Sequence, residues 1–518
     1  MKTDVLVIGA GGAGLVAAIA ARKQGAEVAV CSKSSSGLGG CTAYAGGGFT
    51  LAVGKVTPAE HKANTWSVGR RVNQEPLLNV LSNQGEQALR QLQDWGVTID
   101  IGDGHATVTA TAARPIMGGA GFTRELTEIA RRQGVQFREN VVATRLLLGD
   151  GAIQGVHLVD WQTGSDQVIT AGSVILATGG AGQIYRRTDN PARITGDGYA
   201  LALAAGLPLI DMEFVQFYPL GWAEPGFPRW MIGLPVIDRA RLTDQNGEEF
   251  LLQAIQRWGL KNGREANLFA RDRSAQEVGR KWHHGGKVHL HLEEVQESDW
   301  DRRSLRQLLA FYPPGVSPRQ YGPVQVAPIQ HYFTGGVVID NDGRTDIPGL
   351  FACGEVTGGV DGASRIGGNA LTNIVTFGLR AGTAAASERR PHPDAAAVGR
   401  IRALGGNSLP PAQLREQIQD IVEAGIGPIR TAAEMARAID RLDEIKPQLD
   451  GVRIDSARDR LLALEMPGLW MSARAVLQAA LLREESRGVH YREDFPEEQE
   501  QWQRNILVEW RDGRMVAR

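Results

Sequence analysis

The segment Thr3-Asp4-Val5-Leu6-Val7-Ile8 runs directly into the glycine-rich turn Gly9-Ala10-Gly11-Gly12-Ala13-Gly14, and these residues decide the fold. The β-branched run predicts a buried parallel strand, followed by a helix over residues 14–24 and a second strand over 27–31. Between a strand and a helix, GxGxxG permits a tight turn and lets a pyrophosphate approach the helix N-terminus. The start of the chain therefore predicts a Rossmann-like, dinucleotide-binding α/β domain.

A second element of the same kind follows at Ser173-Val174-Ile175-Leu176-Ala177-Thr178-Gly179-Gly180. The acidic residue that binds the ribose of NAD is absent after the second strand, where Ser32-Lys33 stands instead. Two separated dinucleotide-type elements indicate FAD, because a cofactor of that length needs contacts from distant loops. Thr195-Gly196-Asp197-Gly198 then begins a helix.

A third glycine-rich region extends from His331 to Leu371 and includes Gly354-Glu355 and Arg365-Ile366-Gly367-Gly368-Asn369-Ala370-Leu371. Glycines let a flat ring approach the backbone, and the helix start offers free N–H groups and a positive dipole end. His331 and Arg365 can together grip a carboxylate. The region predicts a catalyst that acts on an acid.

The size and composition of the chain limit the classes of protein to which it can belong. At 518 residues the chain is long enough for roughly three domains. A formal net charge of −2 does not indicate a protein that binds nucleic acid. The three cysteines exclude a disulfide framework and a four-cysteine iron–sulfur site made by this chain alone, and we expect a reducing cytoplasm.

The apolar stretch over residues 5–21 is interrupted by Gly9, Gly11, Gly12 and Gly14, which argues against a signal peptide. No run reaches the about 18 apolar residues of a membrane helix. We therefore expect no direct membrane insertion, and any membrane association would come through a partner subunit.

The pattern along the chain predicts four segments. Residues 1–212 form the first part of the FAD-binding domain, and residues 213–330, rich in prolines and tryptophans, form an inserted α+β capping domain. Residues 331–386 complete the FAD-binding domain. Residues 387–518 form a C-terminal helical domain and a charged tail.

These motifs, taken in order, resemble the flavoprotein subunits of the succinate dehydrogenase/fumarate reductase family, which includes L-aspartate oxidase. The resemblance extends over most of the chain and includes further segments at Asp211-Met212-Glu213-Phe214, Ala270-Arg271-Asp272, His331-Tyr332 and Glu485-Ser486-Arg487-Gly488-Val489-His490.

The resemblance implies a two-electron flavin reaction that interconverts a saturated and an unsaturated dicarboxylate. It makes Arg271 the proton donor or acceptor, and His331 and Arg365 the groups that bind the substrate carboxylate. Because the chain has no cluster or haem motif, its electrons must pass through a separate partner, for which we expect an iron–sulfur or other electron-transfer subunit, or react directly with oxygen or free fumarate. The resemblance places FAD contacts at Gly9, Gly11, Gly12, Ala13, Gly14, Ser32, Lys33, Gly40, Cys41, Thr42, Gly47, Gly48, Ala177, Thr178, Gly179, Asp197, Glu355, Arg365, Asn369, Ala370 and Leu371.

The chain departs from the family where the second half of a dicarboxylate would bind. Where the family has the motif QFHPTG, this chain has Tyr218 and Leu220 in place of the histidine and the threonine. Tyr218 is either a packing residue or a substrate contact. The family's acidic TExxRGEG segment is replaced by the apolar residues 232–237. We therefore expect a substrate with one carboxylate and a bulkier or apolar remainder.

A further departure is Cys41, which aligns with the histidine that attaches the flavin in complex-II members. We expect noncovalent FAD, with a Cys41 thioether as the alternative. His283, His284, His289 and His291 resemble a metal cluster, but the alternation of the last two predicts a polar strand face, and we expect no metal.

Two other functions stay open at this point. The chain could be an electron-transfer subunit whose old substrate pocket is vestigial, since polar groups are lost at positions 218, 220 and 233–237. It could also be an aspartate-oxidase-like enzyme, which would produce hydrogen peroxide from an amino acid.

Overall fold

A computed structural model describes the chain except for residues 109–117, 284, 389, 391–405 and 407–408. Its central sheet has the order β6 (Gln136–Arg138), β2 (Val28–Cys31), β1 (Lys2–Ile8), β9 (Asp166–Leu176), β8 (Ala152–Asp160) and β7 (Val141–Gly149). A further strand, β16 (Leu350–Ala352), pairs in parallel with β9. Strands β6, β2, β1 and β9 are also parallel, as the buried apolar run at the N-terminus predicts.

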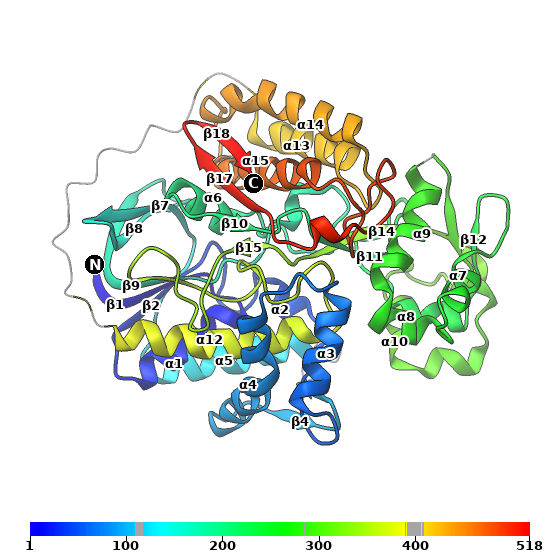
Figure 1. Cartoon of the computed structure of the whole chain (residues 1–518), viewed down its shortest axis with the longest axis horizontal. Helices are drawn as coiled ribbons and strands as arrows, with labels where there is room; N and C mark the ends of the chain where they lie inside the picture. The colour runs from blue at the N-terminus through cyan, green and yellow to red at the C-terminus, as the bar shows by residue number, and fades with distance from the viewer. Residues whose placement is uncertain (109–117, 284, 389, 391–405, 407–408) are drawn as a thin grey trace.

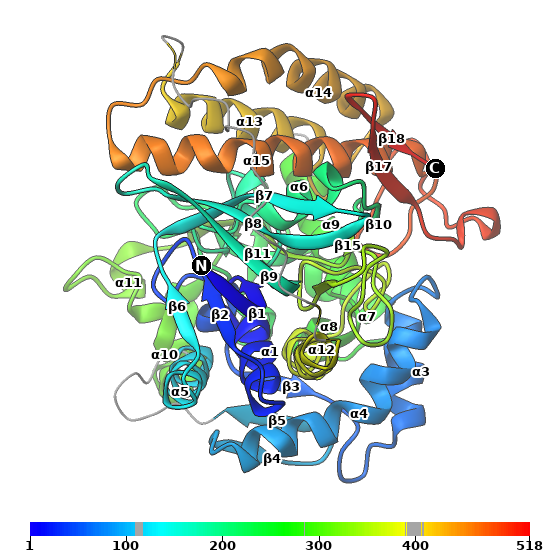
Figure 2. The same ribbon diagram turned by 90° about the vertical axis from the view of Figure 1, so that its left-hand side faces the viewer.

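One face of this sheet is covered by α1 (Gly12–Lys23), α5 (Gly118–Arg132) and α12 (Asn369–Ser387), as Figure 2 shows. Helices α1 and α12 pack closely because a Cβ at Gly382 would lie 2.2 Å from the carbonyl oxygen of Ala17. The first turn is equally tight: a Cβ at Gly14 would lie 1.9 Å from the carbonyl oxygen of Gly9, whose φ is +111°. Only glycine fits there, so the GxGxxG turn and the helix start α1 depend on each other.

The edge of the domain carries further helices and a small sheet. These are α2 (Cys41–Tyr44), α3 (Pro58–Val68), α4 (Glu75–Asp94), and a small sheet of β3 (Gly48–Thr50), β5 (His105–Val108) and β4 (Ile99–Ile101). Helix α6 (Asp197–Ala204) follows the turn at residues 195–196.

The capping domain lies to one side of the molecule (Figure 1). The chain enters it through β11 (Val215–Trp222) and leaves through β14 (Val324–Phe333), and these strands pair antiparallel. The sheet continues through β13 (Val288–Leu290) and β12 (Leu242–Asp244). Around it lie the helices α7 (Leu251–Arg257), α8 (Gly263–Phe269), α9 (Arg271–His283), α10 (Arg303–Leu309) and α11 (Pro318–Tyr321). Its buried apolar side chains form a cluster separate from the main core.

The C-terminal part contains α13 (Pro411–Gly425), α14 (Ala432–Ile445) and α15 (Ala457–Leu482). These helices pack on the other side of the central sheet from α1 (Figure 2). The tail then forms a hairpin of β17 (Leu507–Arg511) and β18 (Arg514–Ala517), which the sequence did not predict. Strand β17 pairs with β10 (Leu209–Ile210), and β10 pairs with β15 (Gly336–Val337).

The architecture confirms the predicted fold class, a Rossmann-like domain with an inserted α+β cap and a helical C-terminal region. No helix of the described residues is both long and apolar enough to cross a membrane.

Candidate functional site

A cavity of about 1070 Å³ extends from the glycine-rich turn before α1 to the capping domain. A small acid alone would leave most of this volume empty, whereas a dinucleotide and an acid together are of a size to occupy it. Most of the predicted FAD contacts line the cavity, namely Gly9, Gly11, Gly12, Ala13, Ser32, Lys33, Gly40, Cys41, Thr42, Gly47, Gly48, Ala177, Thr178, Gly179, Asp197, Glu355, Arg365, Ala370 and Leu371.

Two predicted contacts lie elsewhere. Gly14 packs against the backbone of Gly9 and gives α1 its close start. Asn369 is fully buried at the start of α12, where its side chain binds the ring of His61 at 3.0 Å and the hydroxyl of Thr65 at 3.1 Å. Both residues hold the cavity wall in place and do not line it.

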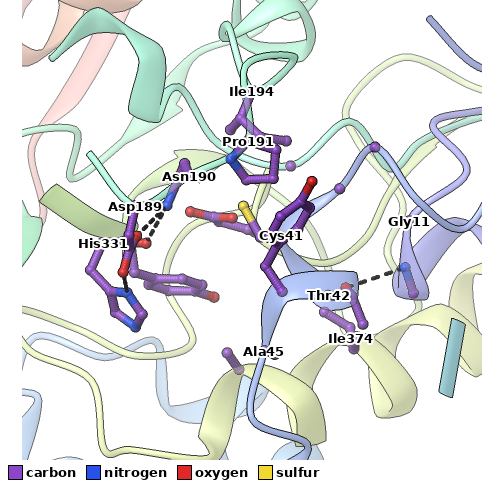
Figure 3. Close-up of a pocket in the computed structure, with 18 of the residues that line it drawn as sticks. Gly11, Cys41, Thr42, Ala45, Asp189, Asn190, Pro191, Ile194, His331 and Ile374 are labelled. Carbon is purple, nitrogen blue, oxygen red and sulfur yellow. Dashed lines mark hydrogen bonds and ion pairs between the residues drawn. The ribbon is translucent and has the colours of Figure 1, made fainter. Parts of the chain in front are cut away.

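The N-terminus of α1 forms an open cradle. A Cβ at Gly11 would meet nothing within 4 Å, so this turn faces free space. The Gly12 N–H donates to the Thr42 hydroxyl at 3.3 Å, which brings α2 beside the turn (Figure 3). The buried Thr178 hydroxyl has no hydrogen-bond partner in the described structure. An anionic group at a helix N-terminus with a spare hydroxyl nearby fits the pyrophosphate end of FAD.

Lys33 lies at the same end of the cavity. Its ammonium group is 2.7 Å from a carboxylate oxygen of Asp197 and 3.0 Å from Glu465, a fully buried residue of α15. Arg193 and Arg415 also contact Glu465, at 3.3 and 3.6 Å. Glu465 was not singled out from the sequence, because nothing local marks a helix residue more than four hundred positions away as a partner of Lys33.

Arg365 presents a buried cation to the other end of the cavity. Its guanidinium donates to the amide oxygen of Gln216 at 3.1 Å and lies 4.2 Å from the centre of the Tyr332 ring. The residue is 5% exposed, and its Nε has no hydrogen-bond partner among the described residues. A buried guanidinium with an unused donor is suited to an incoming carboxylate.

Arg271, the first residue of α9, is a second buried cation. It is 7% exposed, donates to the amide oxygen of Asn267 at 3.2 Å and lies 4.9 Å above the ring of Tyr218. In the described part of the chain no carboxylate forms an ion pair with it: Asp272 binds Arg70 at 2.8 Å, and Glu277 binds Arg280 at 3.2 Å. Burial, together with the nearby cation of Arg365, lowers the pKa of Arg271 to about 10.

His331 is held by a carboxylate. Its Nδ1 lies 2.8 Å from Oδ2 of Asp189, and its carbonyl oxygen accepts from the side-chain amide of Asn190 at 2.9 Å. Figure 3 shows this group on the side of the cavity opposite Gly11 and Thr42, with Cys41 between them. No local signal in the sequence marks Asp189 as a partner of His331. The pairing of Asp189 with His331 arises because β14 runs beside the segment that contains Asp189, with the N–H of Gln330 donating to the carbonyl oxygen of Arg187 at 2.9 Å.

Tyr218 lines the cavity, but its hydroxyl is already used. It donates to the side chain of Asn267 at 2.6 Å and accepts from the N–H of Leu234 at 3.0 Å. Burial raises the pKa of Tyr218, so the hydroxyl keeps its proton. Its position beneath Arg271 indicates that Tyr218 supports that guanidinium.

The apolar replacements seen in the sequence are arranged differently from the expectation. Leu220 is fully buried in the capping core, and in the segment 232–237 only Gly233 reaches the cavity. The apolar wall comes instead from the capping residues Trp230, Met231, Leu308 and Phe311. Trp230 and Met231 directly precede the apolar segment 232–237, whereas Leu308 and Phe311 belong to a second apolar run, so only the fold shows that the two segments converge.

Two further ionisable groups line the centre of the cavity. Burial raises the pKa of the Glu355 carboxyl to about 7, although the Phe333 N–H donates to it at 3.1 Å. Burial, and then the charge of Glu355, raises the pKa of the Cys41 thiol well above its usual range. Cys41 is therefore a thiol rather than a reactive thiolate at neutral pH.

The predicted histidine patch lies in the capping domain, apart from the cavity, with His284 outside the described residues. His289 belongs to β13, while His291 follows it and binds Thr243 at 3.0 Å and Glu293 at 2.9 Å. Glu294 is engaged by Arg241 at 2.6 Å.

The fold and the cavity define a class of protein, the FAD-binding oxidoreductases. Residues 4–371 match the family described as "FAD binding domain", and residues 415–516 match "Fumarate reductase flavoprotein C-term". The chain is 34% identical to one of the subunits of the fumarate reductase (CoM/CoB) of Methanothermobacter marburgensis, over 98% of this chain and 97% of the relative. It is 32% identical to L-aspartate oxidase of Streptomyces coelicolor, over 100% and 93%.

Among solved structures, a mutant of E. coli quinol fumarate reductase FrdA superimposes with a TM-score of 0.85, at 27% identity over 100% of this chain and 96% of that one. The chain therefore belongs to the fumarate reductase/succinate dehydrogenase flavoprotein family. It is an FAD-dependent oxidoreductase of the type that acts on CH–CH groups.

Proposed function

We propose that this protein interconverts the C=C and C–C forms of an acid that has one carboxylate and an apolar remainder. One observation supports this most strongly: the basic groups Arg271, His331 and Arg365 line the same cavity as the apolar capping wall of Trp230, Met231, Leu308 and Phe311. The cations suit a carboxylate, and the wall suits an apolar remainder.

The cofactor of the proposed reaction is noncovalent FAD. When bound, it would exchange a hydride, which carries two electrons, with the substrate. The start of α1, Lys33 and the unpaired Thr178 hydroxyl would hold its polar parts. The raised pKa of the Cys41 thiol supports noncovalent binding, because the thiolate needed to form a thioether is scarce.

The chain's own residues prepare the acid for reaction. Arg365 and Arg271 are both buried, so their attraction for a carboxylate is weakly screened by solvent. Phe311 and Trp230 would exclude water from the apolar part of the substrate. For the electrons we propose a separate partner, an iron–sulfur or other electron-transfer subunit, in the cytoplasm.

Anaerobic flavin spectroscopy tests the proposal. The holoenzyme is reduced chemically, mixed with fumarate or with alkyl- and aryl-substituted 2-enoic acids, and followed by the return of oxidised-flavin absorbance. We expect reoxidation by the substituted monocarboxylates and little by fumarate. Efficient reoxidation by fumarate with no preference for larger acids would contradict the substrate class.

The same experiment separates the other functions. Failure of every acid to oxidise the reduced flavin would indicate an electron-transfer subunit with a vestigial pocket. Formation of hydrogen peroxide from L-aspartate in air would indicate an aspartate-oxidase-like enzyme.

A further inference from the structure

Asn267, a residue of α8 that lines the cavity, has an amide group of which only the oxygen is engaged. Oδ1 accepts a hydrogen bond from the hydroxyl of Tyr218 at 2.6 Å and another from the guanidinium of Arg271 at 3.2 Å. Because a guanidinium can only donate, the amide oxygen must face Arg271, and the Nδ2 group points away from it. Nδ2 has no hydrogen-bond partner among the described residues. Asn267 therefore has an N–H donor to offer to a molecule in the cavity.

A second donor lies on the other side of the Tyr218 hydroxyl. The Leu234 N–H donates to this hydroxyl at 3.0 Å, so the preceding residue, Gly233, lies beside it. Gly233 lines the cavity, and a Cβ added to it would meet only the ring of Pro235, at 3.8 Å. Within the described structure the Gly233 N–H has no acceptor. Two neutral N–H groups thus line the region in which the sequence departs from the dicarboxylate site of the family.

This region has little positive charge to spare for a second substrate carboxylate. Its two buried cations are Arg271 and Arg365, and both have acidic neighbours. The charge of Asp189 acts on Arg271, and the charges of Glu355 and Asp361 interact with that of Arg365. Burial raises the pKa of the Asp361 carboxyl to about 6, so this group is ionised at neutral pH. A second substrate carboxylate would therefore be buried without a cation of its own, which is unfavourable.

We propose that the substrate carries a neutral carbonyl group at the end of its C=C bond opposite the carboxylate, and that Asn267 selects this group by donating a hydrogen bond to its oxygen. The substrates are then 4-oxo-2-enoic acids, in which an amide, ester or ketone carbonyl joins the C=C bond to the apolar remainder. This inference rests on the proposed function and narrows its substrate class. Asn267 is a specificity-determining residue, and the Gly233 N–H is a second donor to the same oxygen.

The carbonyl group also makes the C=C bond more reactive. A C=C bond conjugated only to a carboxylate anion accepts a hydride poorly, because the anion repels the added negative charge. A neutral carbonyl group draws that charge onto its oxygen, where fixed N–H donors stabilise it. Asn267 contacts Arg271, which the resemblance to the family makes the proton donor. The donor to the carbonyl oxygen and the acid for the adjacent carbon are therefore neighbours.

Atoms and electrons balance in the reducing direction. The α-carbon, next to the carboxylate, takes a hydride with both electrons drawn from reduced FAD. The β-carbon, next to the carbonyl group, takes a proton from Arg271, which is reprotonated from water. The product is the saturated 4-oxo acid, the flavin is left oxidised, and no other bond is formed or broken.

The binding of saturated acids tests the inference without turnover. Holoenzyme with oxidised FAD is titrated with acids that differ only in the carbonyl oxygen, 4-oxo-4-phenylbutanoate against 4-phenylbutanoate and 4-oxopentanoate against pentanoate. The flavin absorbance gives each Kd, and we expect the oxo acid of each pair to bind about tenfold more tightly. The monoamide and the monomethyl ester of succinate test the amide and ester forms, and both should bind more tightly than succinate.

The variant N267D isolates the donor. An aspartate carboxylate still accepts from Tyr218 and Arg271 but cannot donate, so the preference for the oxo acid in each pair should fall from about tenfold to about one or below. The added charge weakens the binding of both acids of a pair, so the ratio of their Kd values is the quantity to compare. N83D is the matched control and should leave the ratio unchanged, because Asn83 lies outside the cavity and donates to the carbonyl oxygen of Asn79 at 2.8 Å. FAD content and melting temperature report whether each variant folds, and N267S is a second variant without the amide donor.

The rate of flavin reoxidation gives a second readout. Reduced holoenzyme is mixed rapidly with 4-oxo-4-phenyl-2-butenoate and, separately, with 4-phenyl-2-butenoate. N267D should lower the limiting rate for the first acid at least about tenfold more than the rate for the second, because only the first has an oxygen that Asn267 can stabilise.

Equal Kd values within the pairs for the wild-type protein, or a ratio that N267D and N267S leave unchanged, would overturn the inference. Tighter binding of succinate than of its monoamide and monoester would also overturn it. The proposed function fails by a different result, namely that no unsaturated acid reoxidises the wild-type flavin, and the binding ratios are measured independently of that result.

Discussion

Replacement of Arg271 by methionine should stabilise the protein without substrate and impair the binding of the acid. Arg271 is 7% exposed, and burial lowers its pKa from the ordinary range of arginine to about 10. At one pKa unit per 1.36 kcal/mol, holding the charge in the folded state costs about 3 kcal/mol at any pH below about 10. R271M removes this cost while losing a hydrogen bond to Asn267 and the contact with the Tyr218 ring, each worth about 1 kcal/mol. The net expectation is stabilisation by about 1 kcal/mol.

The effect on binding has the opposite sign. A charge-assisted hydrogen bond contributes about 1.5–3 kcal/mol, so R271M should raise the Kd of an acid by about 10–150-fold. The melting temperature of the holoenzyme without acid gives the first effect, and titration of the flavin absorbance with a saturated acid gives the second. R280M is the control, because Arg280 lies on the same helix but pairs with Glu277. A lower melting temperature together with an unchanged Kd would refute the reasoning.

Three further predictions concern the rest of the cavity. Burial raises the pKa of Glu355 from 4.5 to about 7, so its contribution to stability is complete below about pH 4.5 and is lost as the pH rises through about 7. The melting temperature of E355Q apoprotein minus that of wild type should therefore increase over this pH range and then level off. A difference that stays constant with pH would contradict this prediction. Denatured wild-type protein should show no flavin fluorescence in a gel, and C41S should keep its FAD; a fluorescent wild-type band lost in C41S would demonstrate a thioether. E465Q removes the carboxylate shared by Lys33 and two arginines and should destabilise the protein by about 3 kcal/mol, seen as a lower melting temperature. D443N, which changes a half-exposed ion pair, should alter the melting temperature little. Equal effects of the two variants would contradict a stabilising role of the buried network.

Local signals allowed much of the fold to be predicted from the sequence. The apolar run before GxGxxG and the glycines themselves prescribe β1, the turn and α1, because each constraint acts over a few residues. The strand β17 was missed, since it is stabilised by pairing with β10, some three hundred residues earlier. A short charged strand has no pattern that reveals such a partner.

The cavity was predictable to the extent that its residues belong to recognisable motifs. Arg365 and His331 stand among glycines that mark close approach, whereas Asp189 and Glu465 owe their positions to long-range packing. Leu220, by contrast, belongs to a recognisable motif but does not line the cavity. The sequence predicted a change in the substrate site at this position, but the pairing of β11 with β14 has a register shift between Tyr218 and Gly221, and the Leu220 side chain lies in the capping core.

The structure of the holoenzyme with the most effective acid bound would test the central claim most directly. We predict a single carboxylate within hydrogen-bond distance of Arg365 and Arg271, and the apolar remainder against Phe311 and Trp230. A dicarboxylate bound through both of its charged ends, or a carboxylate placed away from the two arginines, would contradict this account.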